Sequence, residues 1–208
     1  MLLAETSAAA ARPLDLVTAV FVSILVGLAF AEMLACLRDA IRKHGIRIDD
    51  MLVFLTFFLT GVRFFIGNQL YLSSMSLEKG QEVLWFYDFI VLTLISVMLV
   101  MMGSVSSVEG NESSKIGIYP MLIGLYVSDV LWIGSHKFLS VAGLSSRSAP
   151  PPLEWAVLNI ALILSVLVIA VLARRNLYSR RALAALGFVN GAAFIVDLYL
   201  VIKNGIVG

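Results

Sequence analysis

Six uninterrupted apolar runs dominate the sequence, and each has the length that a membrane-spanning helix needs. A helix rises about 1.5 Å per residue, so about 20 apolar residues cross a hydrocarbon core of about 30 Å. Transmembrane β-strands would instead alternate apolar and polar residues over segments of about ten positions. The sequence therefore predicts six transmembrane helices joined by short loops, over residues 14–37, 51–73, 83–105, 116–139, 153–173 and 182–202.

The composition excludes several other classes of protein. Hydrophobic residues make up 60% of the chain and charged residues 14%, against about 45–50% and about 25% in soluble domains. The single cysteine, Cys36, excludes an internal disulfide, and the net charge of +1 gives no overall attraction to nucleic acid. We therefore expect one all-α integral membrane domain over residues 1–208, surrounded by lipid, and not a soluble enzyme, a secreted disulfide scaffold or a disordered chain.

The positions of the basic residues predict the orientation in the membrane. Residues 38–47 and 174–181 each contain four Lys or Arg, and such residues are enriched in cytoplasmic loops. Four predicted helices separate the two segments, so both fall on one side. We expect that side to face the cytoplasm in a cell (inner or plasma) membrane, with both termini extracytoplasmic. These segments can also bind an anionic lipid or another anionic ligand, through Arg38, Arg42, Lys43, Arg174, Arg175, Arg180 and Arg181.

Three charged residues interrupt the apolar runs near their middle. Arg63 follows Met51, the start of its run, by twelve residues; Asp129 has a similar depth, and Asp197 lies slightly nearer the extracytoplasmic end. Ionised groups inside a bilayer are costly and generally face the bundle interior or a water-filled cavity. A carboxylate would offset the burial of a guanidinium that always stays charged. Arg63 is therefore predicted to pair with Asp129 or Asp197.

Other polar residues lie nearer the extracytoplasmic ends of the runs. We expect Asp88, Asn68 and His136 to extend the network of Arg63 outward. Three charged residues in mid-membrane are more than the register of the helices requires. We therefore expect a solute, ion or proton site between the second, third, fourth and sixth predicted helices. The alternative is a buried ion pair that only fixes the helix register.

Small residues predict close helix packing. The first predicted helix carries small residues at five positions spaced by four, among them Gly27, and the sixth contains a GxxxG motif that ends at Gly191. Such residues let two helix backbones approach closely, within one chain or between copies, and we expect a homo-oligomer. Glu32, near the cytoplasmic end of the first predicted helix, either extends toward Arg38 or caps a gate.

The sequence contains no familiar catalytic motif. Its two histidines, His44 and His136, fall on opposite sides of the membrane in the predicted topology and cannot share a metal ion. We therefore expect no enzymatic activity, no metal and no cofactor. The favoured function is a channel or transporter for an ion, a proton or a small solute. Two alternatives remain: a non-transporting scaffold, sensor or accessory subunit, and a ligand-triggered effector that permeabilises the membrane.

Overall fold

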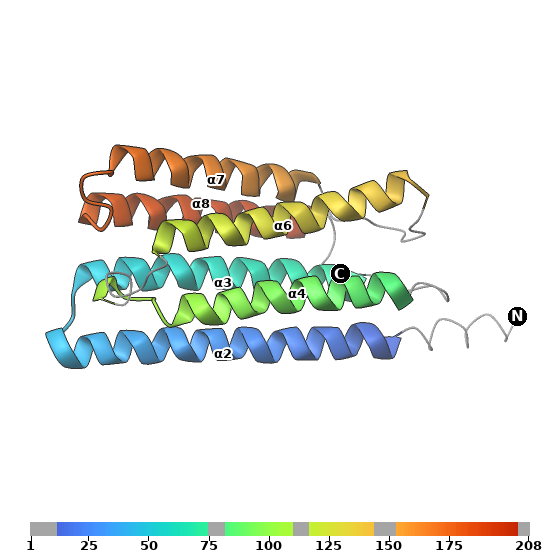
Figure 1. Cartoon of the computed structure of the whole chain (residues 1–208), viewed down its shortest axis with the longest axis horizontal. Coiled ribbons are helices and arrows are strands. Elements are labelled where there is room, and N and C mark those ends of the chain that lie inside the picture. Colours follow the sequence, from blue (N-terminus) through green and yellow to red (C-terminus); the bar gives the residue numbers. More distant parts are fainter. Residues whose placement is uncertain (1–11, 75–81, 110–116, 144–152, 204–208) are drawn as a thin grey trace, which may run out of the picture.

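The computed structural model describes residues 12–74, 82–109, 117–143 and 153–203, and side chains within 17–67, 86–109, 117–143 and 153–203 (Figure 1). Within these residues there are six helices and no strand. Each helix is long and apolar enough to cross a membrane, which confirms the predicted all-α membrane bundle. The helices are α2 (Arg12–His44), α3 (Ile48–Ser74), α4 (Glu82–Gly103), α6 (Ile118–Val141), α7 (Leu153–Leu172) and α8 (Arg180–Lys203).

The largest difference from the predicted boundaries is at the end of α2. This helix continues to His44, two turns beyond the apolar run, so Arg38, Arg42 and Lys43 lie on a helix and not in a loop. It stops at Gly45, whose φ of +74° is a left-handed conformation that glycine adopts without steric strain. Hydrophobicity marked the membrane-crossing part of the helix, and the glycine marked its end.

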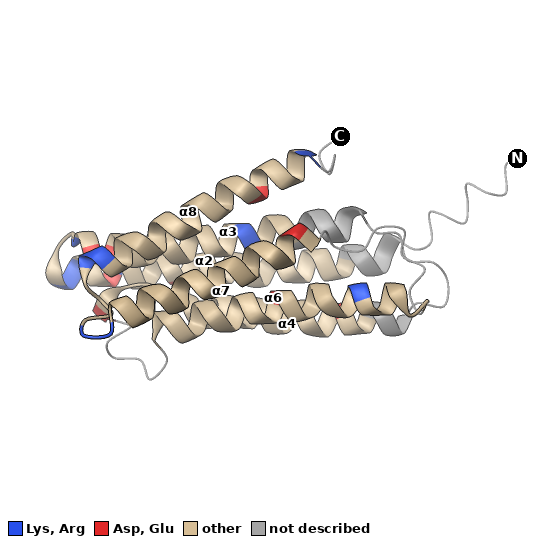
Figure 2. Cartoon of the chain, turned by 90° about the horizontal axis from the view of Figure 1, so that it is seen from above, with Lys and Arg blue, Asp and Glu red and all other residues tan. Residues whose placement is uncertain are grey.

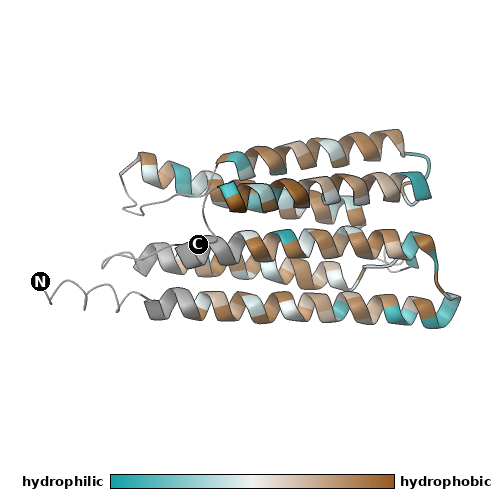
Figure 3. Ribbon diagram, turned by 180° about the vertical axis from the view of Figure 1, so that it is seen from behind, coloured by the Kyte–Doolittle hydropathy of each residue, from teal (hydrophilic) through white to brown (hydrophobic). Residues whose placement is uncertain are grey.

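The helices run up and down in an antiparallel bundle (Figure 1). Helix α2 packs on α3 and α4, and α7 packs on α6 and α8. Contacts between α3 and α8, and weaker ones between α4 and α6, join these two groups of three. Hydrophobic residues cover the length of the helices, and hydrophilic residues gather at the ends of the bundle (Figure 3).

Both basic segments lie at the same end of the bundle. The Arg180 Nε atom, at the start of α8, is 3.1 Å from the Asp49 Oδ1 atom, at the start of α3. Charged residues of both signs gather at this end in Figure 2. Helix α2 begins, and α8 ends, on the side of the bundle away from the basic segments (Figures 1 and 2). The predicted even number of spans between the basic segments is confirmed, and the side of the membrane that each end faces stays a prediction.

The glycines of the bundle differ in how closely another helix approaches them. Cβ atoms at Gly187 and Gly191, the two glycines of the GxxxG motif, would lie 3.6 Å from the Thr56 Oγ1 atom and 3.9 Å from Leu59, which are ordinary contact distances between α8 and α3. A Cβ atom at Gly103 would lie 2.7 Å from the Ala29 carbonyl oxygen, so α4 contacts α2 at backbone distance. Gly27, by contrast, has no atom within 4 Å of its Cβ position in the described structure. Gly27 therefore packs against no described part of the chain, and its role in packing between copies stays a prediction.

Candidate functional site

An ion pair joins α3 and α8 in the middle of the bundle. The Arg63 Nε atom donates to the Asp197 Oδ2 atom at 2.5 Å. Arg63 is 7% exposed and is among the most buried charged residues that the structure describes. This pair confirms one of the two partners that the sequence predicts for Arg63.

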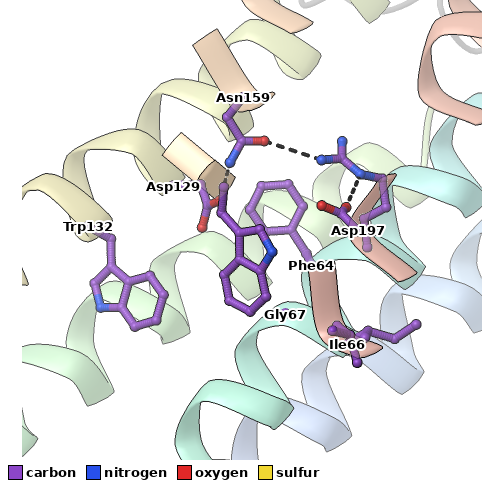
Figure 4. Close-up of a pocket in the computed structure, with 10 residues that line it drawn as sticks. Phe64, Ile66, Gly67, Asp129, Trp132, Asn159 and Asp197 are labelled. Atoms are coloured by element: carbon purple, nitrogen blue, oxygen red, sulfur yellow. Dashed lines mark hydrogen bonds and ion pairs between the residues drawn. The ribbon is translucent and has the colours of Figure 1, made fainter. Parts of the chain in front are cut away.

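The second mid-membrane carboxylate reaches Arg63 through an amide. The Arg63 Nη2 atom donates to the Asn159 Oδ1 atom at 3.5 Å, and the Asn159 Nδ2 atom donates to the Asp129 Oδ2 atom. Figure 4 shows Asn159 between Asp129 and the guanidinium. Asn159 thus connects the positive charge to a carboxylate that forms no direct ion pair with it in the described structure.

A small cavity borders these groups. Its volume is about 30 Å³, which is room for about one or two water molecules. Its lining comes from α3, α6, α7 and α8 (Figure 4). The sequence predicted α4, its third helix, as one of the four helices around the site. In the structure α7 lines the cavity in its place, because α7 packs on both α6 and α8 and brings Asn159 to this position. The residues that line it include Arg63, Asp129, Trp132, Trp155, Asn159 and Asp197.

A buried polar layer lies on the side of the ion pair toward the basic end of the bundle. The Tyr126 hydroxyl donates to the Asn190 Oδ1 atom, and the Thr60 Oγ1 atom donates to the same oxygen at 3.0 Å. The Tyr126 ring centroid is 5.8 Å from the Arg63 Cζ atom, within the range of a cation–π interaction. The aromatic ring and the amide together make this side of the site polar.

A second buried cluster joins α4 and α6. The His136 Nε2 atom is 2.6 Å from the Asp88 Oδ1 atom, and the Trp132 Nε1 atom donates to the same oxygen at 3.1 Å. Asp88 and His136 are only 1% and 2% exposed. Asp88 and His136 contact each other at this interface, and Trp132 links them to the cavity of Arg63, which its side chain also lines. That these two residues extend the network of Arg63 outward stays a prediction.

Asn68 and Glu32 are the remaining predicted site residues. The side chain of Asn68, on α3, is outside the described residues. Glu32 lines another cavity, of about 350 Å³, near the basic end of the bundle together with Cys36 and Lys43. None of the described side chains of α2 lines the cavity of Arg63, so the predicted gate at Glu32 would act at a separate place.

The basic residues at this end of the bundle differ in their surroundings. Arg38 pairs with Asp39 at 3.1 Å, and Lys43 lies 3.4 Å from Glu109. Arg174 and Arg175 line a surface hollow of about 400 Å³ between α7 and α8. Binding of an anionic lipid or ligand at these residues stays a prediction.

Sequence reasoning missed two important residues. Asn159 is the one amide in the apolar run of α7, and an isolated amide inside a membrane helix was a signal that it has a buried polar partner. Tyr126 carried no comparable signal, because tyrosine is common in membrane helices and only its neighbours show that its hydroxyl is buried.

No protein-family model matches this chain, and comparisons with curated proteins and with solved structures give no match either. The six-helix membrane architecture rests on the sequence and the fold of the chain itself. What the protein does must be argued from the chemistry of the site. Among the described residues, no group of three His, Cys, Asp or Glu is arranged to hold a metal ion.

Proposed function

We propose that this protein is a transporter or channel that moves a proton or a small monovalent cation across the membrane through the cavity at Arg63. The observation that carries the proposal is the charge of the site. Two carboxylates, Asp129 and Asp197, line the cavity with a single guanidinium. Arg63 neutralises Asp197 directly, so an ionised Asp129 leaves one negative charge in a low-dielectric interior. A bound proton or cation removes that cost.

The size of the cavity supports the same class of ion. About 30 Å³ of space admits about one or two water molecules and no larger solute in this conformation. The polar layer of Tyr126, Thr60 and Asn190 continues from Arg63 toward the basic end. Polar groups at this depth are the usual lining of ion and proton pathways in membrane proteins.

Flux through the purified protein in liposomes tests the proposal. Vesicles carry the pH indicator pyranine inside, and valinomycin with a potassium gradient sets the membrane potential. We expect proton uptake well above that of protein-free vesicles. Asp129→Asn should lower the uptake at least tenfold, because an amide neither takes up a proton nor attracts a cation as a carboxylate does. Sodium and potassium flux are measured in parallel.

The matched control is Asp39→Asn, which removes an exposed carboxylate at the basic end and is expected to leave flux unchanged. Absence of proton, sodium and potassium flux through the unmodified protein would contradict the proposal. It would favour the alternative of a non-transporting scaffold, sensor or accessory subunit, in which Arg63 and Asp197 only hold helices together.

A further inference from the structure

Two buried N–H groups at the cavity lack a hydrogen-bond acceptor. They are the Arg63 Nη1 and Trp155 Nε1 atoms, and neither has a partner among the described residues. Both residues are 7% exposed, and both line the cavity. Buried donors in native proteins nearly always have an acceptor, which is either another protein group or an ordered water molecule. The two orphaned donors therefore indicate that something occupies this space.

The charge and the volume of the cavity indicate which kind of molecule or ion occupies it. An anion would accept both N–H groups, but it would face the carboxylates of Asp129 and Asp197 in a low-dielectric site. A metal cation cannot accept a hydrogen bond. A water molecule is neutral, fits a volume of about 30 Å³, and accepts hydrogen bonds while it donates two. Asp129 lines the same cavity and provides an acceptor for one of its protons.

We infer that the cavity binds a water molecule that accepts hydrogen bonds from Trp155 and Arg63 and donates one to Asp129, and that protons reach Asp129 through this water. The proton route rests on the proposed function and deepens it, because it names the proton as the transported ion. One of the two N–H hydrogen bonds opens and a proton binds the freed lone pair of the water oxygen; another O–H bond of the same oxygen then breaks, and an O–H bond forms on the Asp129 carboxylate. A neutral water molecule is left in place.

The groups around this water have separate roles. Arg63, from α3, stays paired with Asp197, from α8, and their charges largely cancel. Helix α6 contributes Asp129, the group that takes the proton, and α7 contributes the neutral side chains of Trp155 and Asn159. Trp155 is therefore a positioning residue, because it holds the water and does not itself gain or lose a proton.

Trp132 provides a matched comparison for Trp155. Both indole side chains line the same cavity and both are buried. The Trp132 Nε1 atom, however, donates to Asp88 at 3.1 Å, whereas the Trp155 Nε1 atom has no acceptor among the described residues. The two indole N–H groups should therefore differ in their contact with water.

Hydrogen exchange measures this difference without any transport assay. Protein labelled with ¹⁵N-tryptophan is placed in nanodiscs, and the indole signals are assigned with Trp155→Phe and Trp132→Phe. We expect the Trp155 indole N–H to show magnetisation exchange with water and to exchange in D₂O at least tenfold faster than that of Trp132. Equal protection of the two indoles would overturn the bound water, and this result is read from the unmodified protein.

Flux then tests the proton route. Trp155→Phe keeps the aromatic ring and removes the N–H, so we expect proton flux in the pyranine assay to fall at least fivefold with an unchanged melting temperature. Proton flux equal to that of the unmodified protein would overturn the route through this water, even if the indole exchanges rapidly. Absence of flux in the unmodified protein would instead overturn the proposed function and, with it, the proton route, and leave the water site to be judged by exchange.

Discussion

The Arg63 guanidinium lies 2.5 Å from the Asp197 carboxylate, and this contact joins residues 134 positions apart in the chain. It fixes the register of α3 against α8 at the depth where the cavity lies. Because a buried ion pair adds little net stability compared with well-packed apolar residues, the pair also raises the question of what else these charges do. The orphaned Arg63 Nη1 atom and the nearby carboxylate of Asp129 indicate that part of the charged site is available to a ligand.

The first prediction concerns the stability of this pair. Asp197→Asn removes the carboxylate that pairs directly with the buried guanidinium, and we expect the free energy of unfolding to fall by about 3 kcal/mol. The double variant Arg63→Met with Asp197→Leu removes both charges and should recover most of that loss. Chemical unfolding in detergent micelles measures both. An equal loss in the single and the double variants would show that the charges themselves hold the fold together.

The second prediction concerns the amide that connects Arg63 to Asp129. Asn159→Leu removes both of its hydrogen bonds with little change in volume, and we expect proton flux to fall about tenfold. Ser165→Ala, at a half-buried position of the same helix that does not line the cavity, is the control and should conduct normally. Normal flux in Asn159→Leu would exclude Asn159 from the conducting site.

The third prediction concerns the approach of α4 to α2. A methyl group at Gly103 would lie 2.7 Å from the Ala29 carbonyl oxygen, and we expect Gly103→Ala to destabilise the fold by about 1–3 kcal/mol. Gly27→Ala is the control, because its Cβ position has open space around it. Thermal unfolding of the two variants should therefore separate them clearly, and similar melting temperatures would contradict the close contact.

The fourth prediction concerns the outward face of α2 at Gly27. If copies of the chain associate through this face, Gly27→Leu will weaken association and leave the fold of each chain intact, since the added side chain meets no atom of its own chain in the described structure. Chemical cross-linking in membranes and light scattering in detergent measure the oligomeric state. A monomeric unmodified protein would contradict the predicted homo-oligomer.

The fifth prediction concerns orientation. Cys36 is the only cysteine, and it lies partly exposed near the basic end. A membrane-impermeant maleimide should label it in inverted vesicles and not in intact spheroplasts. Lys203→Cys in a Cys36→Ser background should show the opposite pattern, because α8 ends at the other face. Labelling of Cys36 in intact spheroplasts would reverse the predicted orientation.

The sequence by itself determined the six helices and the placement of both basic segments at one end. Those features depend on the length of each apolar run and on the number of runs, which are local properties of the chain. It also identified Arg63, Asp129 and Asp197 as charges at membrane depth, since depth follows from position along a helix.

Only the tertiary structure decided which of these residues meet. A helix that is apolar on nearly every side carries little signal of how it is rotated about its axis, so the sequence left open both Asp129 and Asp197 as partners of Arg63. Packing of α7 between α6 and α8 brought Asn159 into the site, and packing of α4 on α6 brought Asp88 and His136 into contact. Helix rotation and neighbour choice arise from side-chain fit across the whole bundle, which no single segment of the chain contains.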